Sequence, residues 1–254
     1  MSWQVPTVHL LTLLLATLRA SAWIVFCPPF QSRAIPGTVR ALLALSLALL
    51  VTPDLLEQTP PLTVPDFLVS AVEQIVVGVA LGFITALFFA AIQVAGDLID
   101  LFGGYSLAFS FDPLTINSSS VFGRFYSLIA TTLLFASDGH QLVVRGFLQS
   151  YETLPLDGTL SMATVGRLLT DGIGEMFLIG LQIAGPLIAV LFLTDIALGL
   201  LNRVAPALQA FVLGFPAKIF LTLALAGTAI AVLPYALDKL VSIAVRAVVG
   251  VAGG

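Results

Sequence analysis

The stretch VEQIVVGVALGFITALFFAAIQVAGDLIDLFGG, residues 72–104, is a long apolar segment that ends in two adjacent glycines. It overlaps an apolar run from Phe67 to Ala95, and a helix needs roughly 20 such residues to cross the hydrocarbon core of a bilayer. Further apolar runs lie at 10–26, 39–51, 128–136, 177–201 and 204–233. Several reach membrane-spanning length, whereas the shorter ones are typical of segments that are re-entrant or buried in protein.

The composition also indicates a membrane protein. Of the 254 residues, 59% are hydrophobic and 9% are charged, whereas soluble domains carry about 25% charged residues. The ten Lys and Arg residues are scattered singly and the net charge is −4, so we expect no nucleic-acid partner. The scattered arginines define no serpentine topology by the positive-inside rule. We therefore expect an all-α integral membrane protein with a non-serpentine topology, held in a protein assembly.

The N-terminal apolar run has the length of a signal sequence. No Lys or Arg precedes it, and Arg19 stands where the apolar core of a signal should give way to small residues. We interpret this run as a retained helix.

Catalytic chemistry is not indicated. The sequence lacks phosphate-binding and metalloprotease motifs, and its two histidines are too few and too isolated for a metal site. We therefore expect no enzyme, no cofactor and no metal.

Three polar residues of the long segment share one helical face. Gln93, Asp97 and Asp100 are spaced i, i+4 and i+7 and lead directly to Gly103 and Gly104. Ionised groups within a bilayer usually face a bundle interior or an aqueous path, which predicts a stripe directed toward a pore. The alternative is that these carboxylates lie at a helix end that meets water.

Two other features indicate packing surfaces. Gly78 and Gly82 form a G-x-x-x-G motif, which permits close approach of helices. Asp195, Gly199 and Asn202 repeat the i, i+4 and i+7 spacing next to Arg203, and the polar residues are candidates for pairing within an assembly. A structural hydrogen bond is the simpler interpretation for Asp195. The segment 141–152 predicts an amphipathic helix with a polar stripe formed by Gln141, Arg145, Gln149 and Glu152.

The residues that follow the long segment predict a loop. Gly103 and Gly104 permit unusual backbone angles, and Asp112 before Pro113 disfavours a helix, so the helix should end near residue 103. Irregular backbone at membrane depth requires protein or water to satisfy its polar groups, so an aromatic loop here favours a constriction in a channel. An interfacial aromatic belt is the alternative. The apolar side chains of the loop are Tyr105, Leu107, Phe109 and Phe111.

Several motifs, taken in order, resemble one family. FGGYSLAFSFDP (102–113), FASDGHQLVVRGFLQSYETLPL (135–156) and above all DIALGLLNRVAPALQAFVLGFPAKI (195–219) are similar to the FliR/SctT family of type III export-gate proteins. FQSRAIPGTVRALLAL (30–45) and the stretch 72–100 fit the same family, so the resemblance covers nearly the whole chain. LGLLNRVAP (198–206) and FVLGFPAK (211–218) resemble the flagellar branch more closely than the injectisome branch.

The resemblance implies a subunit of a helical assembly of stacked helical hairpins, built with FliP and FliQ and with FlhB against it. This export gate would lie at the bacterial inner membrane in the flagellar basal body and conduct unfolded exported proteins. Residues 1–174 would correspond to a FliP-like part, and residues 175–254 to a FliQ-like helical hairpin. Residues expected by this resemblance to serve subunit packing are Asn202, Arg203, Pro206, Gly214, Pro216 and Lys218.

The resemblance also assigns the loop. Residues from Phe102 to Asn117 would form a plug that seals the pore, with the two glycines as its hinge and the aromatic side chains as its stopper. Two alternatives of other classes stay open. One is an ion-coupled secondary transporter that uses Asp97, Asp100 and Asp195, and the other is a scaffold whose pore lies in other subunits.

Overall fold

The computed structural model describes residues 7–32, 34–56, 63–105, 120–156, 162–205, 214–228, 230 and 233–234, and these residues form helices and turns without a strand. The chain divides into two compact units. Among the described residues, the first unit contains those up to 88 and from 137 to 172, and the second contains those from 89 to 136 and from 173 onward. Each unit has its own packing and is described by itself.

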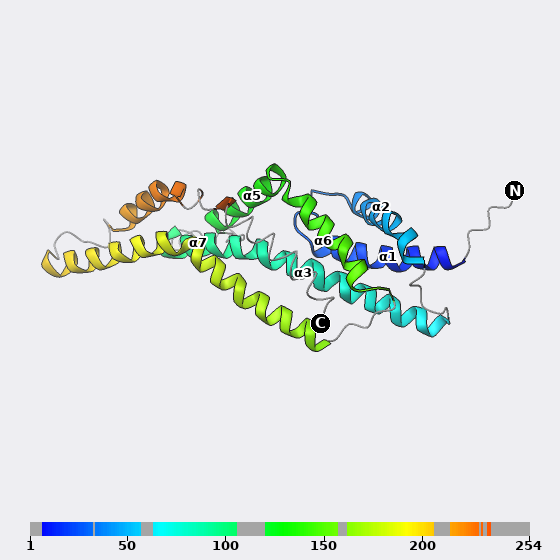
Figure 1. Ribbon diagram of the computed structural model, residues 1–254. Coiled ribbons are helices and arrows are strands. Elements are labelled where there is room, and N and C mark those ends of the chain that lie inside the picture. The colour runs from blue at the N-terminus through cyan, green and yellow to red at the C-terminus, as the bar shows by residue number, and fades with distance from the viewer. Residues whose placement is uncertain are drawn as a thin grey trace, which may run out of the picture. The chain divides into compact units, whose positions relative to one another are not determined.

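The first unit combines four helical segments. They are α1 (Thr7–Phe26), α2 (Gly37–Leu55), the first part of α3 (Val64–Gly103) and α6 (Gly139–Thr153). Helix α1 packs against α2 and runs along the first part of α3, and α2 also contacts α6 (Figure 1). Trp23 of α1 stacks on Phe147 of α6 with ring centroids 4.3 Å apart, so aromatic packing joins α6 to the core of this unit.

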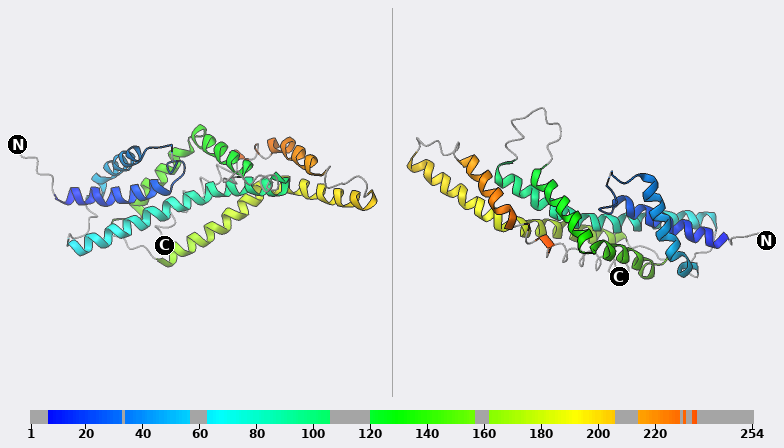
Figure 2. Two further views of the ribbon diagram at one scale, coloured as in Figure 1. Left: turned by 180° about the vertical axis from the view of Figure 1, so that it is seen from behind. Right: turned by 90° about the horizontal axis from the view of Figure 1, so that it is seen from above.

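The second unit is built around the rest of α3. It adds α5 (Val121–Ala136), the part of α7 (Met162–Val204) from Ile173, and a helix at Gly214–Thr228, which lies beside the end of α7 (Figure 2). Gly96 of α3 faces the backbone of Gly123 of α5, and Gly180 of α7 packs on Ala91 and Val94 of α3. Helices α5 and α7 therefore both approach α3 closely at glycines.

Local sequence explains where several helices begin. Pro36, with φ −57°, precedes α2, and a proline ring is compatible with the start of a helix but not with its interior. Ser120 caps α5, because its Oγ accepts the Gly123 N–H at 2.8 Å. Asp138 precedes α6 with φ 56°, a left-handed conformation that Asp adopts more readily than most residues.

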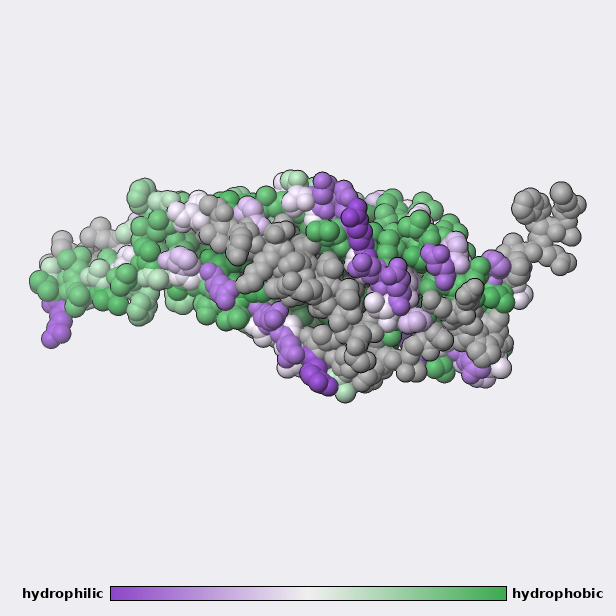
Figure 3. Space-filling view, in the orientation of Figure 1, coloured by the Kyte–Doolittle hydropathy of each residue, from purple (hydrophilic) through white to green (hydrophobic). Residues whose placement is uncertain are grey.

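The expected helices agree with these elements. Five of the apolar runs fall within α1, α2, α3, α5 and α7, and the described part of the run 204–233 includes the helix Gly214–Thr228. The long helix that was expected to end near residue 103 ends there. The amphipathic prediction for 141–152 is also confirmed, because Val143, Phe147 and Tyr151 are buried. Its four polar residues are exposed and belong to the hydrophilic patch along α6 (Figure 3).

Four helices among the described residues are long and apolar enough to cross a membrane: Thr7–Phe26, Gly37–Leu55, Val64–Gly103 and Leu169–Val204. Large apolar side chains stay exposed on them, for example Leu42, Val72 and Leu193, and exposed apolar surface of this extent requires lipid or protein to cover it. The chain is an all-α integral membrane protein, as expected. The expected boundary between the FliP-like part (1–174) and the FliQ-like hairpin (175–254) falls inside the continuous helix α7. The division of the chain at that point stays a prediction.

Candidate functional site

The candidate site lies where α3 ends. The helix stops at Gly103, and Gly104 has φ +85°, a conformation that favours glycine. A Cβ at Gly103 would lie 2.8 Å from Thr222 Oγ1, and one at Gly104 would lie 3.3 Å from the ring of Phe215. Both glycines therefore sit close against the helix Gly214–Thr228, which leaves no room for a larger side chain at Gly103.

The predicted plug is only partly within the described residues. Phe102 is half-exposed at the end of α3, and the ring of Tyr105 packs edge-on against Phe122 with centroids 5.3 Å apart. Partial burial, together with the nearby Asp100 carboxylate, raises the pKa of Tyr105, so its phenol is neutral at physiological pH. The predicted plug residues that lie outside the described residues are Leu107, Phe109, Phe111, Asp112 and Pro113.

Asp100 joins the end of α3 to the start of α5. This carboxylate is buried, and its Oδ2 accepts a hydrogen bond from Ser120 Oγ and another from the Phe122 N–H at 2.9 Å. A carboxylate at a helix N-terminus is favourable, because it pairs an N–H that has no partner within the helix and complements the helix dipole. Asp100 therefore acts as a second cap for α5, supplied by another helix.

The predicted polar stripe has three different environments. Gln93 is exposed, Asp97 is half-buried and Asp100 is buried. Asp97 packs over Gly123, where its Oδ1 fills the space that a Cβ would take, and this oxygen has no hydrogen-bond partner among the described residues. The three residues share a face as predicted, but in the single chain Gln93 is the one of the three that is exposed.

The second set of predicted residues lies where α7 meets the helix Gly214–Thr228. Lys218 Nζ forms an ion pair with Asp195, at 2.8 Å from Oδ1 and 2.9 Å from Oδ2. Gly214 packs against Leu198, whereas Asn202, Arg203 and Pro216 are exposed. Pro206 lies outside the described residues. The structure thus places Asp195 and Lys218 together within the chain, and the role of the exposed residues in subunit packing stays a prediction.

Gly78 and Gly82 form a close contact within the first unit. A Cβ at Gly78 would overlap the Arg19 carbonyl and lie 2.8 Å from Ala22 Cβ, and one at Gly82 would lie 2.8 Å from Phe26 Cβ. Helix α1 therefore fills the groove that the two glycines create on α3. Their proposed contribution to packing between subunits stays a prediction.

A buried polar centre around Arg19 was not among the predicted sites. Arg19 is fully buried, and its guanidinium donates to Gln74 Oε1 at 2.6 Å, to the Ser150 carbonyl at 3.0 Å and to the Leu154 carbonyl at 2.9 Å. It also lies 4.4 Å from the centroid of the Tyr151 ring. These contacts join α1, α3 and the end of α6.

The amide of Gln74 and the phenol of Tyr151 complete this centre. Gln74 Nε2 donates to the Leu156 carbonyl at 3.3 Å, and Tyr151 Oη donates to the Ala16 carbonyl at 2.8 Å. Burial raises the pKa of Tyr151, so the phenol stays protonated and keeps its donor. The sequence signal was available, since an arginine inside an apolar run of spanning length usually marks a buried polar contact.

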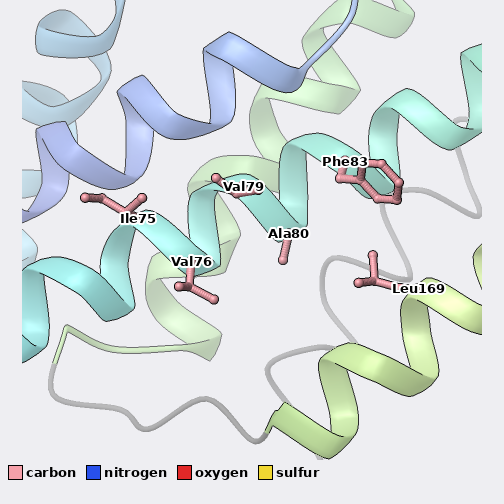
Figure 4. Close-up of a pocket in the computed structure, with 6 residues that line it drawn as sticks. All are labelled: Ile75, Val76, Val79, Ala80, Phe83 and Leu169. Atoms are coloured by element: carbon pink, nitrogen blue, oxygen red, sulfur yellow. The ribbon is translucent and has the colours of Figure 1, made fainter.

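An apolar groove lies between α3 and the first part of α7 in the first unit. Five of its lining residues come from α3 and Leu169 reaches it from α7 (Figure 4), around a cavity of about 340 Å³. The lining residues are Ile75, Val76, Val79, Ala80, Phe83 and Leu169. None of them carries a polar side chain, so this groove offers no group for catalysis or for recognition of a polar ligand.

The sequence matches the family model described as bacterial export proteins, family 1, over residues 10–243. It is 38% identical over 203 residues to the flagellar biosynthetic protein FliR of Pectobacterium carotovorum subsp. carotovorum, an alignment that covers 78% of this chain and 76% of that protein. The FliR protein of Escherichia coli (strain K12) is 36% identical over 199 residues, with the same coverage. The secretion system apparatus protein SsaT of Salmonella typhimurium (strain LT2) is 29% identical over 165 residues, which covers 65% of this chain and 62% of that protein.

Proposed function

The chain belongs to the bacterial export proteins, family 1, and from this premise we propose that it is an export-gate subunit of a flagellar type III secretion system. In this proposal it assembles with FliP and FliQ, and with FlhB against them, at the bacterial inner membrane in the flagellar basal body. The flagellar assignment is supported over the injectisome alternative by higher identity and coverage, 38% over 78% of the chain against 29% over 65%.

The proposed action is conduction of unfolded proteins through a pore that residues 102–117 seal at rest. The observation that carries this proposal is the anchoring of both ends of the loop. Gly103 and Gly104 pack on the helix Gly214–Thr228, while Asp100 binds Ser120 at the other end. Contacts at both ends of the loop support a plug that stays attached to α3 and α5.

The aromatic and aliphatic side chains explain how such a seal works. A hydrophobic constriction excludes water and therefore ions. An unfolded polypeptide brings its own apolar and polar groups, which replace the contacts of the seal as it passes. The proposed mechanism is gating without bond chemistry.

The transporter alternative is less well supported by the geometry. An ion-binding site needs carboxylates that are available to the ion, and two of the three candidates have protein partners. Asp195 pairs with Lys218, and Asp100 accepts hydrogen bonds from Ser120 and Phe122. The scaffold alternative predicts instead that the loop is dispensable.

Ion leak through the assembled gate tests the proposal. The chain would be produced with FliP and FliQ, and the membrane permeability to ions would be compared between wild type and a variant that lacks residues 105–111. We expect leak only in the deletion variant, because the stopper is removed while the anchors at Asp100 and Ser120 stay. The control is Ser118→Gly/Ser119→Gly, which alters the same loop without removing an apolar side chain.

Assembly must be measured in the same cells by co-purification of FliP. Leak in the deletion variant with the complex intact supports the plug. A tight membrane and normal export in that variant would contradict the plug and favour the scaffold. Restoration of swimming in a strain that lacks its own flagellar subunit separates the flagellar assignment from the injectisome assignment.

A further inference from the structure

A second cavity, of about 350 Å³, lies between the end of α2 and the outer face of α6 in the first unit. Its apolar lining includes Val51, Leu148 and Tyr151, and three charged side chains, Asp54, Arg145 and Glu152, also line it. Its volume is at the lower end of the roughly 300–1,000 Å³ that is typical of small-molecule sites. Unlike the groove in Figure 4, this cavity offers charged groups of both signs.

The three charges have no ionic partner within the described part of the chain. Neither carboxylate forms an ion pair with Arg145 there, although all three side chains line one cavity and are exposed. Charged residues make up 9% of the sequence, and three of them line this one cavity. Arg145 and Glu152 belong to the hydrophilic patch along α6 (Figure 3), and Asp54 lines the same cavity from α2.

The C-terminal ends of α2 and α6 place negative charge at the cavity. Asp54 lies in the last turn of α2, which ends at Leu55, and Glu152 lies in the last turn of α6, which ends at Thr153. Helix C-termini carry a partial negative charge, so a carboxylate there is unfavourable unless a cation offsets it. Two carboxylates and two helix C-termini together favour a bound cation.

Arg145 places positive charge at the cavity, on the same face of α6 as Glu152. It precedes Glu152 by seven residues, so the two side chains share a face of α6 and their Cα atoms are separated by about 10 Å along the helix axis. The cavity thus matches a ligand that carries a positive group at one end and a negative group at the other. A purely basic ligand would meet Arg145, and a purely anionic ligand would meet Asp54 and Glu152.

Exposed apolar surface of α2 lies next to the cavity. Leu50 lies one turn before Asp54 on the same face of α2 and is 64% exposed. Helix α2 is itself long and apolar enough to span a bilayer. An apolar chain attached to a ligand in the cavity therefore has exposed apolar side chains beside it.

We propose that this cavity binds the headgroup of a zwitterionic phospholipid that carries a primary ammonium group. The ammonium lies between Asp54 and Glu152, the phosphate lies at Arg145, and an acyl chain follows Leu50 along α2. This proposal requires only the membrane setting and does not depend on the proposed gating function.

Binding of two lipids with identical acyl chains to the full chain in detergent tests the proposal. Phosphatidylethanolamine and phosphatidylglycerol are titrated separately, and bound lipid is counted by native mass spectrometry. We expect phosphatidylethanolamine to bind about tenfold more tightly, since both lipids carry the phosphate but only phosphatidylethanolamine carries a cation. In the variant Asp54→Asn/Glu152→Gln we expect this preference to reverse, because Arg145 is then the only charge in the cavity.

The control is Asp171→Asn/Glu175→Gln, which removes two exposed carboxylates outside the cavity and should keep the wild-type preference. Continued protection of buried Cys27 from maleimide confirms that each variant is folded. Equal affinity of wild type for the two lipids, or a preference that the double variant leaves unchanged, would overturn the proposal. So would a cross-link from Gln149→Cys to a neighbouring gate subunit, since a protein would then occupy the cavity.

Discussion

At the scale of single residues, Arg19 joins three elements of the first unit, because its guanidinium donates to Gln74, Ser150 and Leu154. We expect Arg19→Met to lower the free energy of unfolding by about 2–4 kcal/mol, since it leaves buried acceptors without donors. Arg19→Lys should fall between this variant and wild type, because an ammonium lacks the planar fork of donors. The rate at which maleimide labels the buried thiol of Cys27 in detergent during heating reports the loss of structure.

The control for Arg19 is Arg167→Met on α7, where the side chain is exposed. This change should leave the free energy of unfolding within about 0.5 kcal/mol of wild type. If Arg19→Met were as stable as Arg167→Met, the buried contacts of Arg19 would contribute nothing net.

Cys27 predicts a loss of stability in alkaline solution. Burial raises the pKa of its thiol, so thiolate forms more readily in the unfolded chain, where the pKa is about 8.5. The neutral thiol therefore makes its full contribution to the free energy of unfolding below about pH 8.5. As the pH rises above this value the free energy of unfolding declines, by about 1.4 kcal/mol at pH 9.5. Chemical unfolding in detergent at pH 7.5 and 9.5 measures this decline, and Cys27→Ala should remove it. An equal decline in both proteins would assign the effect to other groups.

At the scale of elements, the contact between α1 and α3 depends on Gly78. A methyl group at this position would overlap the Arg19 carbonyl, so we expect Gly78→Ala to destabilise the chain by about 1–3 kcal/mol. A Cβ added at Gly174 on α7 would meet no atom of the other described residues within 4 Å, and Gly174→Ala should stabilise the chain by about 0.5–1 kcal/mol through helix propensity. In thermal unfolding of the detergent-solubilised chain, the two variants should shift the unfolding midpoint in opposite directions. Shifts of the same sign would show that α1 moves to accommodate the methyl group.

The junction of α3 and α5 depends on Asp100. We expect Asp100→Ala to speed hydrogen exchange at the Phe122 amide by about tenfold, because the hydrogen bond from this N–H is lost, a loss of about 1.4 kcal/mol. Asp100→Asn keeps one oxygen acceptor and should have a smaller effect. Asp97→Ala on the same helix serves as the control, since Phe122 does not donate to Asp97. Unchanged exchange in Asp100→Ala would mean that Ser120 alone holds the start of α5.

The helices could be predicted from sequence, but their partners could not. Apolar runs and the stripe on α6 are local patterns of residues that are neighbours along one helix, so they determine element type and approximate bounds. Arg19 and the Ser150 carbonyl lie 131 residues apart, and no periodicity relates them. The spacing of Gln93, Asp97 and Asp100 likewise predicts a shared face. It does not predict that Ser120 returns to bind Asp100.

At the scale of the whole molecule, the exposed apolar surface must be covered by lipid or by other subunits. Leu50 on α2 and Leu193 on α7 are equally exposed in the single chain, at 64% and 63%. The proposed lipid site adjoins Leu50. Helix α7 instead forms the ion pair between Asp195 and Lys218 with the helix Gly214–Thr228, whose residues are proposed to pack on neighbouring subunits. We therefore expect lipid to stay at Leu50 in the assembled gate and a subunit to replace lipid at Leu193.

Bimane attached to a single cysteine at each position, in a Cys27→Ala background, distinguishes the two surfaces by quenching with brominated lipid. In membranes that contain the chain alone, both labels should be quenched, because both side chains are exposed to the same extent. Co-production of FliP and FliQ should abolish quenching at Leu193→Cys and leave it at Leu50→Cys. Quenching that persists at both positions would mean that α7 faces lipid in the gate, and loss at both would mean that subunits also cover α2 and displace the proposed phospholipid.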